Sequence, residues 1–236
     1  MQPTADPLVG SRRWRSRLAS IEAAAIAGVL CAIGWSLGMR GLLQTPAVDA
    51  TDAEIVSFYA DDNAGRYAVL WLQVIVVATI AFMWFVGVVR SRVGDREPRL
   101  FGTVFLGGAV LLAATIMIGS AALAAPSIVT ELGGQVVDPG AASMFRSFAA
   151  ITLSVFAPRF TALVMLSTAS LGRATQALPT WLIVSSYVLG VVELVNVTVS
   201  EPLVFVFPAW LALVSIVLLV RSPSRGFELT GSDGDA

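Results

Sequence analysis

The sequence contains no histidine, and all fifteen of its basic residues are arginine, so lysine is absent too. Without histidine there is no imidazole to ligate haem or zinc, or to activate a serine or cysteine nucleophile. Without lysine there is no Schiff-base residue and no Walker A phosphate loop. The adjacent pair Asp61–Asp62 is the only carboxylate cluster that could hold a cation, and it is expected at a helix end in water. We therefore expect no enzyme, no cofactor and no metal ion.

Cysteine and charge are also scarce. The single cysteine, Cys31, excludes an intramolecular disulfide and lies in an apolar run, where we predict a small buried side chain. Charged residues make up 13% of the chain, against roughly 25% in soluble domains. Hydrophobic residues make up 56%. This composition indicates a chain whose main solvent is lipid.

What the sequence does have is long apolar runs. Six of them are close to the roughly 20 residues that cross about 30 Å of hydrocarbon. They are Leu18–Gly38, Tyr67–Val89, Leu100–Ala125, Ser147–Leu171, Trp181–Val199 and Leu203–Val220. The first exceeds the roughly 7–15 apolar residues of a signal peptide, so we predict a retained span. The last is the shortest and contains Pro208, so a five-span chain with a re-entrant final segment is the alternative.

We therefore predict an all-α, polytopic transmembrane bundle of six spans over residues 18–220. An arginine-rich segment, 1–17, precedes it, and a polar tail, 221–236, predicted to be disordered, follows it. With the N-terminus inside, eleven arginines fall in inside segments and only Arg40, Arg66 and Arg146 in outer loops. By the positive-inside rule both termini are cytoplasmic, and we expect a bacterial inner membrane.

The outer loops differ in character. Thr51 and Glu54 have the spacing of a capping box, which predicts a short helix over Thr51–Ala60. Ile55, Phe58 and Tyr59 would share one face of it, turned toward the spans or the lipid interface. A packed connector is the favoured interpretation, and a lid for a ligand or partner is the alternative. The next outer loop, Ala124–Ala142, is rich in Pro and Gly and is predicted to be flexible.

Two charges lie inside apolar runs within the stretch 144–199. At 1.5 Å per residue, Arg159 is about 21 Å along its helix from Arg173, and Glu193 is about 18 Å from Trp181. The two helices are antiparallel neighbours, so the charges come to similar depth. Because a lone charge at mid-bilayer costs at least about 2.5–3.5 kcal/mol, we predict an ion pair. The polar residues that could support it are Thr161, Ser185, Ser186 and Asn196.

This ion pair has two interpretations. It is either a packing staple that fixes helix register, which is favoured, or part of a polar path for an anion or proton. Pro158 precedes Arg159 and removes a backbone donor, so a kink or local opening is predicted beside the arginine.

Small residues form a further pattern in the first span. Gly34 and Gly38 make a G-x-x-x-G motif, and Gly28 extends the small face toward the N-terminus. Such faces let two helix backbones approach closely. Packing within the chain is favoured over a dimer interface.

Residues 52–66, DAEIVSFYADDNAGR, precede a span rich in Leu, Trp and Phe and then an arginine-rich inner turn. This arrangement resembles a family of uncharacterised actinobacterial multi-pass membrane proteins, in which an outer A-E-I-x-x-F-Y helix follows the first span and ends near N-x-G-R. The resemblance covers about residues 18–125. It implies a bundle of six or a similar number of spans, and neither an activity nor site residues.

Two functions fit these observations. The favoured one is an accessory or structural subunit that packs against a larger membrane complex. The alternative is a small transporter or channel that uses Arg159 and Glu193. Expected partners are the lipid bilayer and either a membrane-protein partner or further copies of the chain. No nucleic acid is expected, because the arginines of residues 12–17 are typical of a topology signal or an anionic-lipid contact.

Overall fold

The computed structural model describes residues 21–47, 49–61, 63–93, 99–134, 136–176, 178–198 and 201–221, and within these ranges it contains helices and no strand. Among the described residues, five helices are long and apolar enough to cross a membrane: Glu22–Leu42, Ala64–Arg90, Leu100–Glu131, Pro139–Thr175 and Pro202–Arg221. The all-α character is thus confirmed, and the long apolar helices are those that a membrane bundle requires. The predicted segment 1–17 and residues 222–236 of the predicted tail lie outside the described residues, whereas Arg221, also assigned to the tail, is the last residue of the final helix.

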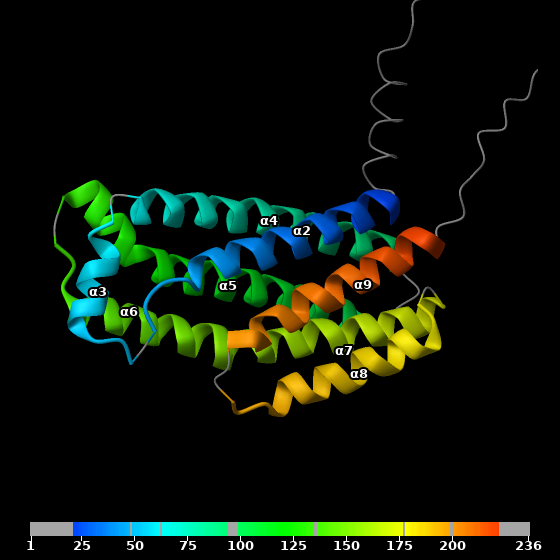
Figure 1. The fold of residues 1–236 in the computed structure, drawn as a ribbon. Coiled ribbons are helices and arrows are strands. Elements are labelled where there is room, and N and C mark those ends of the chain that lie inside the picture. Colours follow the sequence, from blue (N-terminus) through cyan, green and yellow to red (C-terminus); the bar gives the residue numbers. More distant parts are fainter. Residues whose placement is uncertain are drawn as a thin grey trace, which may run out of the picture.

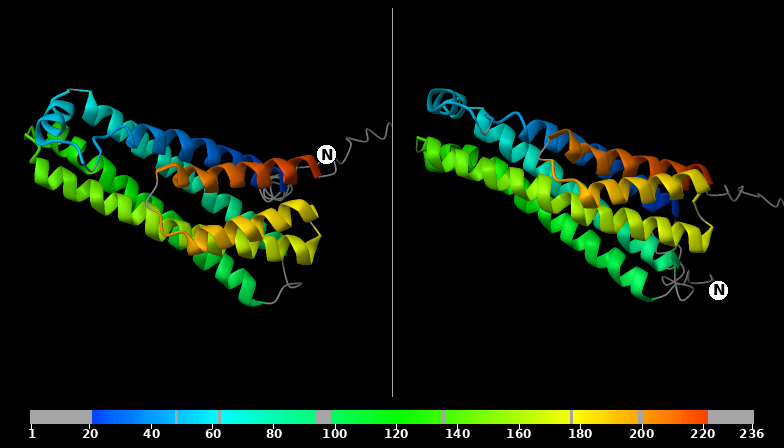
Figure 2. Two further views of the ribbon diagram at one scale, coloured as in Figure 1. Left: turned by 60° about the horizontal axis from the view of Figure 1, so that its bottom comes forward. Right: turned by 90° about the horizontal axis from the view of Figure 1, so that it is seen from below.

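The helices run lengthwise past one another (Figure 1). In chain order they are α2 (Ile21–Leu42), α3 (Asp52–Tyr59), α4 (Ala64–Val93), α5 (Arg99–Gly133), α6 (Pro139–Ile151), the π-helical η2 (Thr152–Phe156), α7 (Ala157–Thr175), α8 (Thr180–Val195), the 3₁₀-helical η3 (Glu201–Phe205) and α9 (Val206–Arg221). α3 lies across one end, called here the α3 end. α2 begins and α9 finishes at the opposite end, called here the terminal end (Figures 1 and 2).

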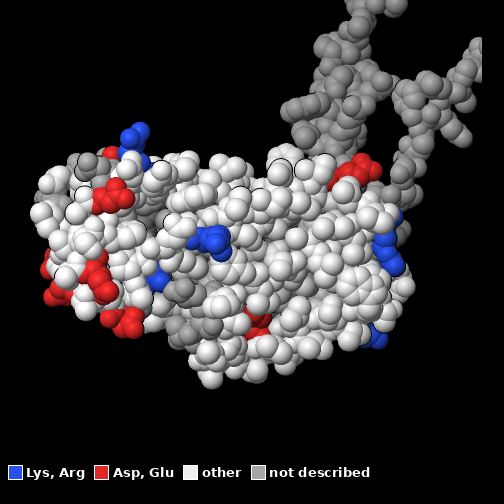
Figure 3. Space-filling model, viewed as in Figure 1, with Lys and Arg blue, Asp and Glu red and all other residues white. Residues whose placement is uncertain are grey.

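Charge follows this division of the molecule. In the face shown in Figure 3, acidic side chains gather over the α3 end, and the surface between the ends is mostly uncharged. α2 packs against α4 and α9, α5 against α4 and α7, and α7 against α8. The bundle therefore has an apolar middle and polar ends, as expected for a protein that contacts lipid along its length.

The predicted flexible loop Ala124–Ala142 is wrong for most of its length. α5 continues through Pro126 to Gly133, and α6 already begins at Pro139. Surrounding alanine, leucine and valine residues sustain the helix past Pro126. It ends instead at Gly134, whose φ of 57° is left-handed and whose N–H donates to the Thr130 carbonyl. Asp138 then caps α6 by accepting from the Ala141 N–H.

Of the last two predicted spans, the structure makes the final one the better candidate for crossing a membrane, which is the opposite of the expectation from the sequence. Pro202–Arg221, which the sequence made the weakest candidate, is long and apolar enough to cross. Pro208 is the third residue of α9 and lies just after the 3₁₀ segment η3, where the helix changes from the 3₁₀ to the α hydrogen-bonding pattern. Most of η3 together with α9 gives this span 20 residues, whereas α8 has 16, or about 24 Å. Six crossings therefore remain a prediction.

The core of the bundle is aromatic and holds α2, α4 and α9 together. Trp35 and Phe82 pack with ring centroids 5.0 Å apart, and Phe207 meets Phe82 edge to face at 5.7 Å. The predicted glycine face is buried within the chain. A Cβ on Gly34 would lie 2.6 Å from that of Ala78, a Cβ on Gly38 would meet Ile75, and one on Gly28 would meet Ser215 of α9. These glycines thus serve close packing inside the bundle.

Candidate functional site

The helix formed by α6, η2 and α7 changes its hydrogen-bonding step in the middle. The Ala157 N–H donates to the Thr152 carbonyl, five residues back, and Pro158 has no N–H to donate. At least one of the carbonyls of Leu153 and Ser154 is therefore left without a helical donor. The structure thus has a π turn beside Pro158, where the sequence predicted a kink or local opening.

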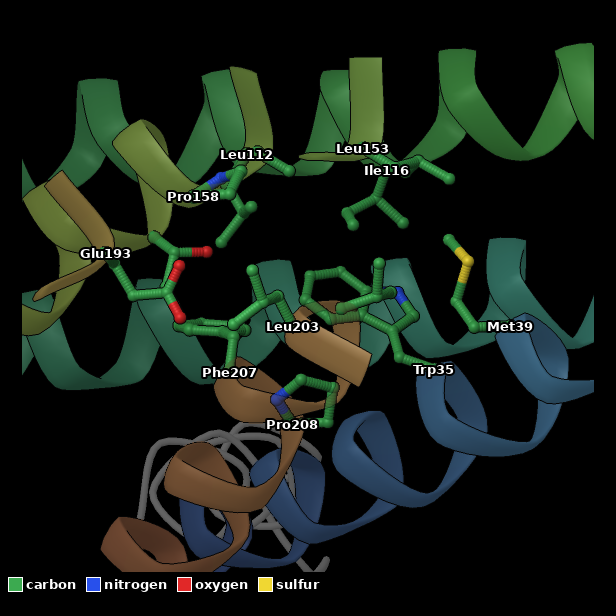
Figure 4. Close-up of a pocket in the computed structure, with 13 residues that line it drawn as sticks. Trp35, Met39, Leu112, Ile116, Leu153, Pro158, Glu193, Leu203, Phe207 and Pro208 are labelled. Carbon is green, nitrogen blue, oxygen red and sulfur yellow. The ribbon is translucent and has the colours of Figure 1, made fainter. Parts of the chain in front are cut away.

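Glu193 faces this irregular turn from α8. It lies 13 residues after Thr180, the first residue of α8, and therefore about 20 Å along the helix from its start. Its side chain is only 3% exposed. It accepts no hydrogen bond from any residue that the structure describes. Figure 4 shows its carboxylate directed into a cavity, toward Leu203 and Phe207.

That cavity is small and almost wholly apolar. About 20 Å³ of it is open to the centre of a water molecule, which is room for about one water. Its wall comes from α2, α5, η2, α7, α8, η3 and α9 (Figure 4). The polar side chains in the wall are Glu193, Thr161 and Trp35, and the indole N–H of Trp35 already donates to Thr79 at 3.0 Å. Glu193 and Thr161 are thus the groups available to a ligand.

The predicted ion pair is not closed in the structure. Arg159 is half-buried, and its buried Nη1 atom has no hydrogen-bond partner. No salt bridge joins it to Glu193 within the described part of the chain, although Arg159 is the charge whose electrostatic field acts on that carboxylate. The fold therefore brings the two charges near one another, and the carboxylate is turned into the cavity instead.

The polar residues expected to support the pair are mostly engaged elsewhere. Ser185 and Ser186 both donate to the Leu182 carbonyl, and Ser186 also accepts from the Trp210 indole at 2.9 Å. Asn196 accepts from the Thr198 N–H. Thr161 alone lines the cavity, and it is 4% exposed. The polar side chains therefore stabilise α8 itself and its contact with α9.

The α3 end holds a buried arginine that the sequence predicts only as a charge in an outer loop. Arg146 of α6 is 8% exposed and donates to the Thr45 hydroxyl at 2.8 Å. The signal that could have found it is its place in a helix with one apolar face. Burial raises the pKa of Tyr59 of α3, and the positive charge of Arg146 partly offsets this effect.

α3 has the capping box that the sequence predicts. The Thr51 hydroxyl accepts from the Glu54 N–H, and the Glu54 carboxylate accepts from the Thr51 N–H at 2.8 Å. Ile55 and Tyr59 are buried in a small cluster with Val137 and Ala142, and Phe58 packs against it. These contacts are those of a packed connector that closes the α3 end.

A metal site does not emerge from the acidic residues. Among the described residues, no group of three or more His, Cys, Asp or Glu side chains could hold a metal ion. Asp61 accepts instead from the Asn63 N–H at 3.0 Å, and Asp62 lies outside the described residues. The cavity at Glu193 is therefore the site with the strongest claim to a function.

The chain matches no family model, no curated protein and no solved structure. The resemblance of residues 52–66 to actinobacterial membrane proteins accordingly stays a prediction from the sequence.

Proposed function

We propose that the protein is a small ion transporter or channel, and that the Glu193 cavity is its binding site within the membrane. The observation that carries this proposal is a carboxyl group, 3% exposed, that faces a cavity and accepts no hydrogen bond from the described residues. Holding a charge there costs at least about 2.5–3.5 kcal/mol. A permanent packing staple would recover that energy by closing onto Arg159, whereas here the carboxyl group faces the cavity.

The backbone around the cavity supports the same function. The wall combines the π turn before Pro158 with the 3₁₀ segment η3. Membrane transporters build their ion sites where helices are interrupted, because freed carbonyls can then face the ligand. π turns inside helices occur often at functional sites. Irregular backbone and a buried acid therefore meet at one place in this bundle.

Ion flux into liposomes tests the proposal. The purified protein is reconstituted, a potassium diffusion potential is imposed, and dyes follow proton and sodium entry. We expect wild-type protein to accelerate entry and Glu193→Gln to reduce it to the rate of protein-free liposomes. The matched control is Glu131→Gln, an exposed acid near the end of α5, which should keep the wild-type rate. Wild-type flux no faster than that of empty liposomes, or unchanged in Glu193→Gln, would refute the proposal.

A double variant separates transport from stapling. Arg159→Met with Glu193→Leu removes both charges, so the protein should fold as well as the wild type or better. Either single change leaves one buried charge and should lower stability by about 3–5 kcal/mol if the two charges depend on each other. Under the proposal the double variant folds and has no flux. A double variant with wild-type flux would leave the pair a structural role only.

An accessory subunit of a larger complex is the second candidate. Met144, Phe148 and Ile151 form an apolar strip along α6, and each is at least half exposed. α8 packs mainly against α7. Gentle purification from native membranes, followed by mass spectrometry, tests the candidate. A large partner at fixed stoichiometry supports an accessory role, and the protein alone or as copies of itself argues for transport.

A further inference from the structure

We propose that the ligand of the Glu193 site is a proton and that Arg159 is its internal competitor. In the state seen here the carboxyl group faces the cavity, as it would when protonated. When it loses the proton, the carboxylate turns to pair with the Arg159 guanidinium. This inference deepens the proposed function, on which it rests for the premise that the site binds a ligand.

The chemistry of the cavity favours a proton over a metal cation. Calcium is held by six to eight oxygen ligands, and magnesium by an octahedron of them. Here the wall offers two side-chain oxygen groups, the Glu193 carboxylate and the Thr161 hydroxyl, in room for about one water. A protonated carboxyl group needs one acceptor for its O–H. Thr161, which makes no hydrogen bond with the described residues, can supply it.

Arg159 has the properties of a competitor. Its buried Nη1 atom lacks a hydrogen-bond partner, so the arginine gains a charge-assisted hydrogen bond if the carboxylate turns toward it. Among the residues that line the cavity from α2, α5, η2, α7, η3 and α9, none is titratable. Arg159 is the charged group that acts on Glu193. When Glu193 loses its proton to water in the cavity, the positive charge of Arg159 therefore balances the negative charge that forms on the carboxylate.

In each of the two states, the charge on Glu193 is either absent or compensated. With the proton bound, Glu193 is neutral and suits an apolar wall, and Arg159 keeps an unpaired nitrogen. With the proton released, the ion pair neutralises both residues at the same depth. A proton entering the cavity has to displace Arg159 from the carboxylate, so binding of the ligand and opening of the pair are one event.

Infrared difference spectroscopy of the protein in lipid nanodiscs tests this inference, because a protonated carboxyl group absorbs apart from a carboxylate. We expect a buried carboxylic-acid band that disappears as the pH rises, is absent in Glu193→Gln and persists in Glu131→Gln. In Arg159→Met the carboxylate has no counter-charge, so the acid band should persist about 1–3 pH units higher. Arg159→Lys keeps the charge and should titrate close to the wild type.

Three results would overturn the inference. One is the absence of any acid band that depends on Glu193, and another is the same titration in Arg159→Met as in the wild type. The third is a band that falls when sodium replaces choline at constant pH, which would make a metal cation the ligand. Circular dichroism and gel filtration verify the fold of each variant. A titrating Glu193 without flux in liposomes would uphold the proton site and refute transport, and flux without titration would do the reverse.

Discussion

Gly38 lies where the backbone of α2 passes directly over α4. A Cβ at this position would meet the Ile75 side chain and lie 3.2 Å from the Trp71 carbonyl oxygen. A backbone atom cannot move aside as a flexible side chain can. We therefore expect Gly38→Ala to lower the free energy of unfolding by about 1–3 kcal/mol.

The control for this change is Gly107→Ala in α5. A Cβ on Gly107 would have nothing within 4 Å, so the alanine should only improve helix propensity, by about 0.5–1 kcal/mol. Thermal unfolding in detergent, followed by tryptophan fluorescence, compares the two variants. Equal stability of Gly38→Ala and Gly107→Ala would show that the backbone of α2 at Gly38 is not in close contact with Trp71 and Ile75 of α4.

At the scale of elements, the interruption between α6 and α7 is where helix geometry meets the cavity. Pro158→Ala restores a backbone N–H and should let the π turn relax toward a regular helix. We expect a gain of about 1 kcal/mol in stability, as the restored bond outweighs the lost packing of the ring. Ion flux in liposomes should fall, because Leu153 of the π turn and Pro158 itself both line the cavity and its wall is remodelled.

Pro126→Ala is the matched control, since Pro126 lies inside α5 and does not line the cavity. It should also raise stability and should leave flux unchanged. If both proline variants reduced flux equally, helix flexibility in general would matter, and the π turn would have no special role.

How far the sequence predicts these elements depends on how local their causes are. The start of α3 follows from Thr51 and Glu54, which are three residues apart, so the capping box could be derived from the sequence alone. The end of α5 could not, because Pro126 and Gly134 both suggest a break and only the surrounding contacts decide between them. The depth of Glu193 follows from counting residues. The direction of its carboxylate depends on helices distant in the sequence, and only the structure shows it.

For the whole molecule, the start of α2 and the end of α9 lie at the same end of the bundle, and this predicts a topology that can be tested. Cys31 is fully buried, so Cys31→Ala gives a background for single cysteines. Ser57→Cys on α3 and Ala174→Cys near the end of α7 are both at exposed positions at opposite ends of the bundle. In intact cells a membrane-impermeant maleimide should label Ser57→Cys, and should label Ala174→Cys only after permeabilisation. The reverse pattern would invert the predicted orientation, and labelling of both from one side would contradict a bundle that crosses the membrane.

The shortness of α8 has a consequence for the lipid itself. Its 16 residues reach about 24 Å, whereas the acyl-chain layer is about 30 Å thick. α5, with 35 residues, exceeds that thickness. If α8 crosses as predicted, the mismatch is one-sided: beside α8 the bilayer would thin by about 6 Å, or polar headgroups would tilt inward, while beside α5 neither is needed. Glu193 lies near the end of α8, so a leaflet that dips there would bring water closer to its carboxyl group, and the length of the surrounding acyl chains would then become part of the environment of the site.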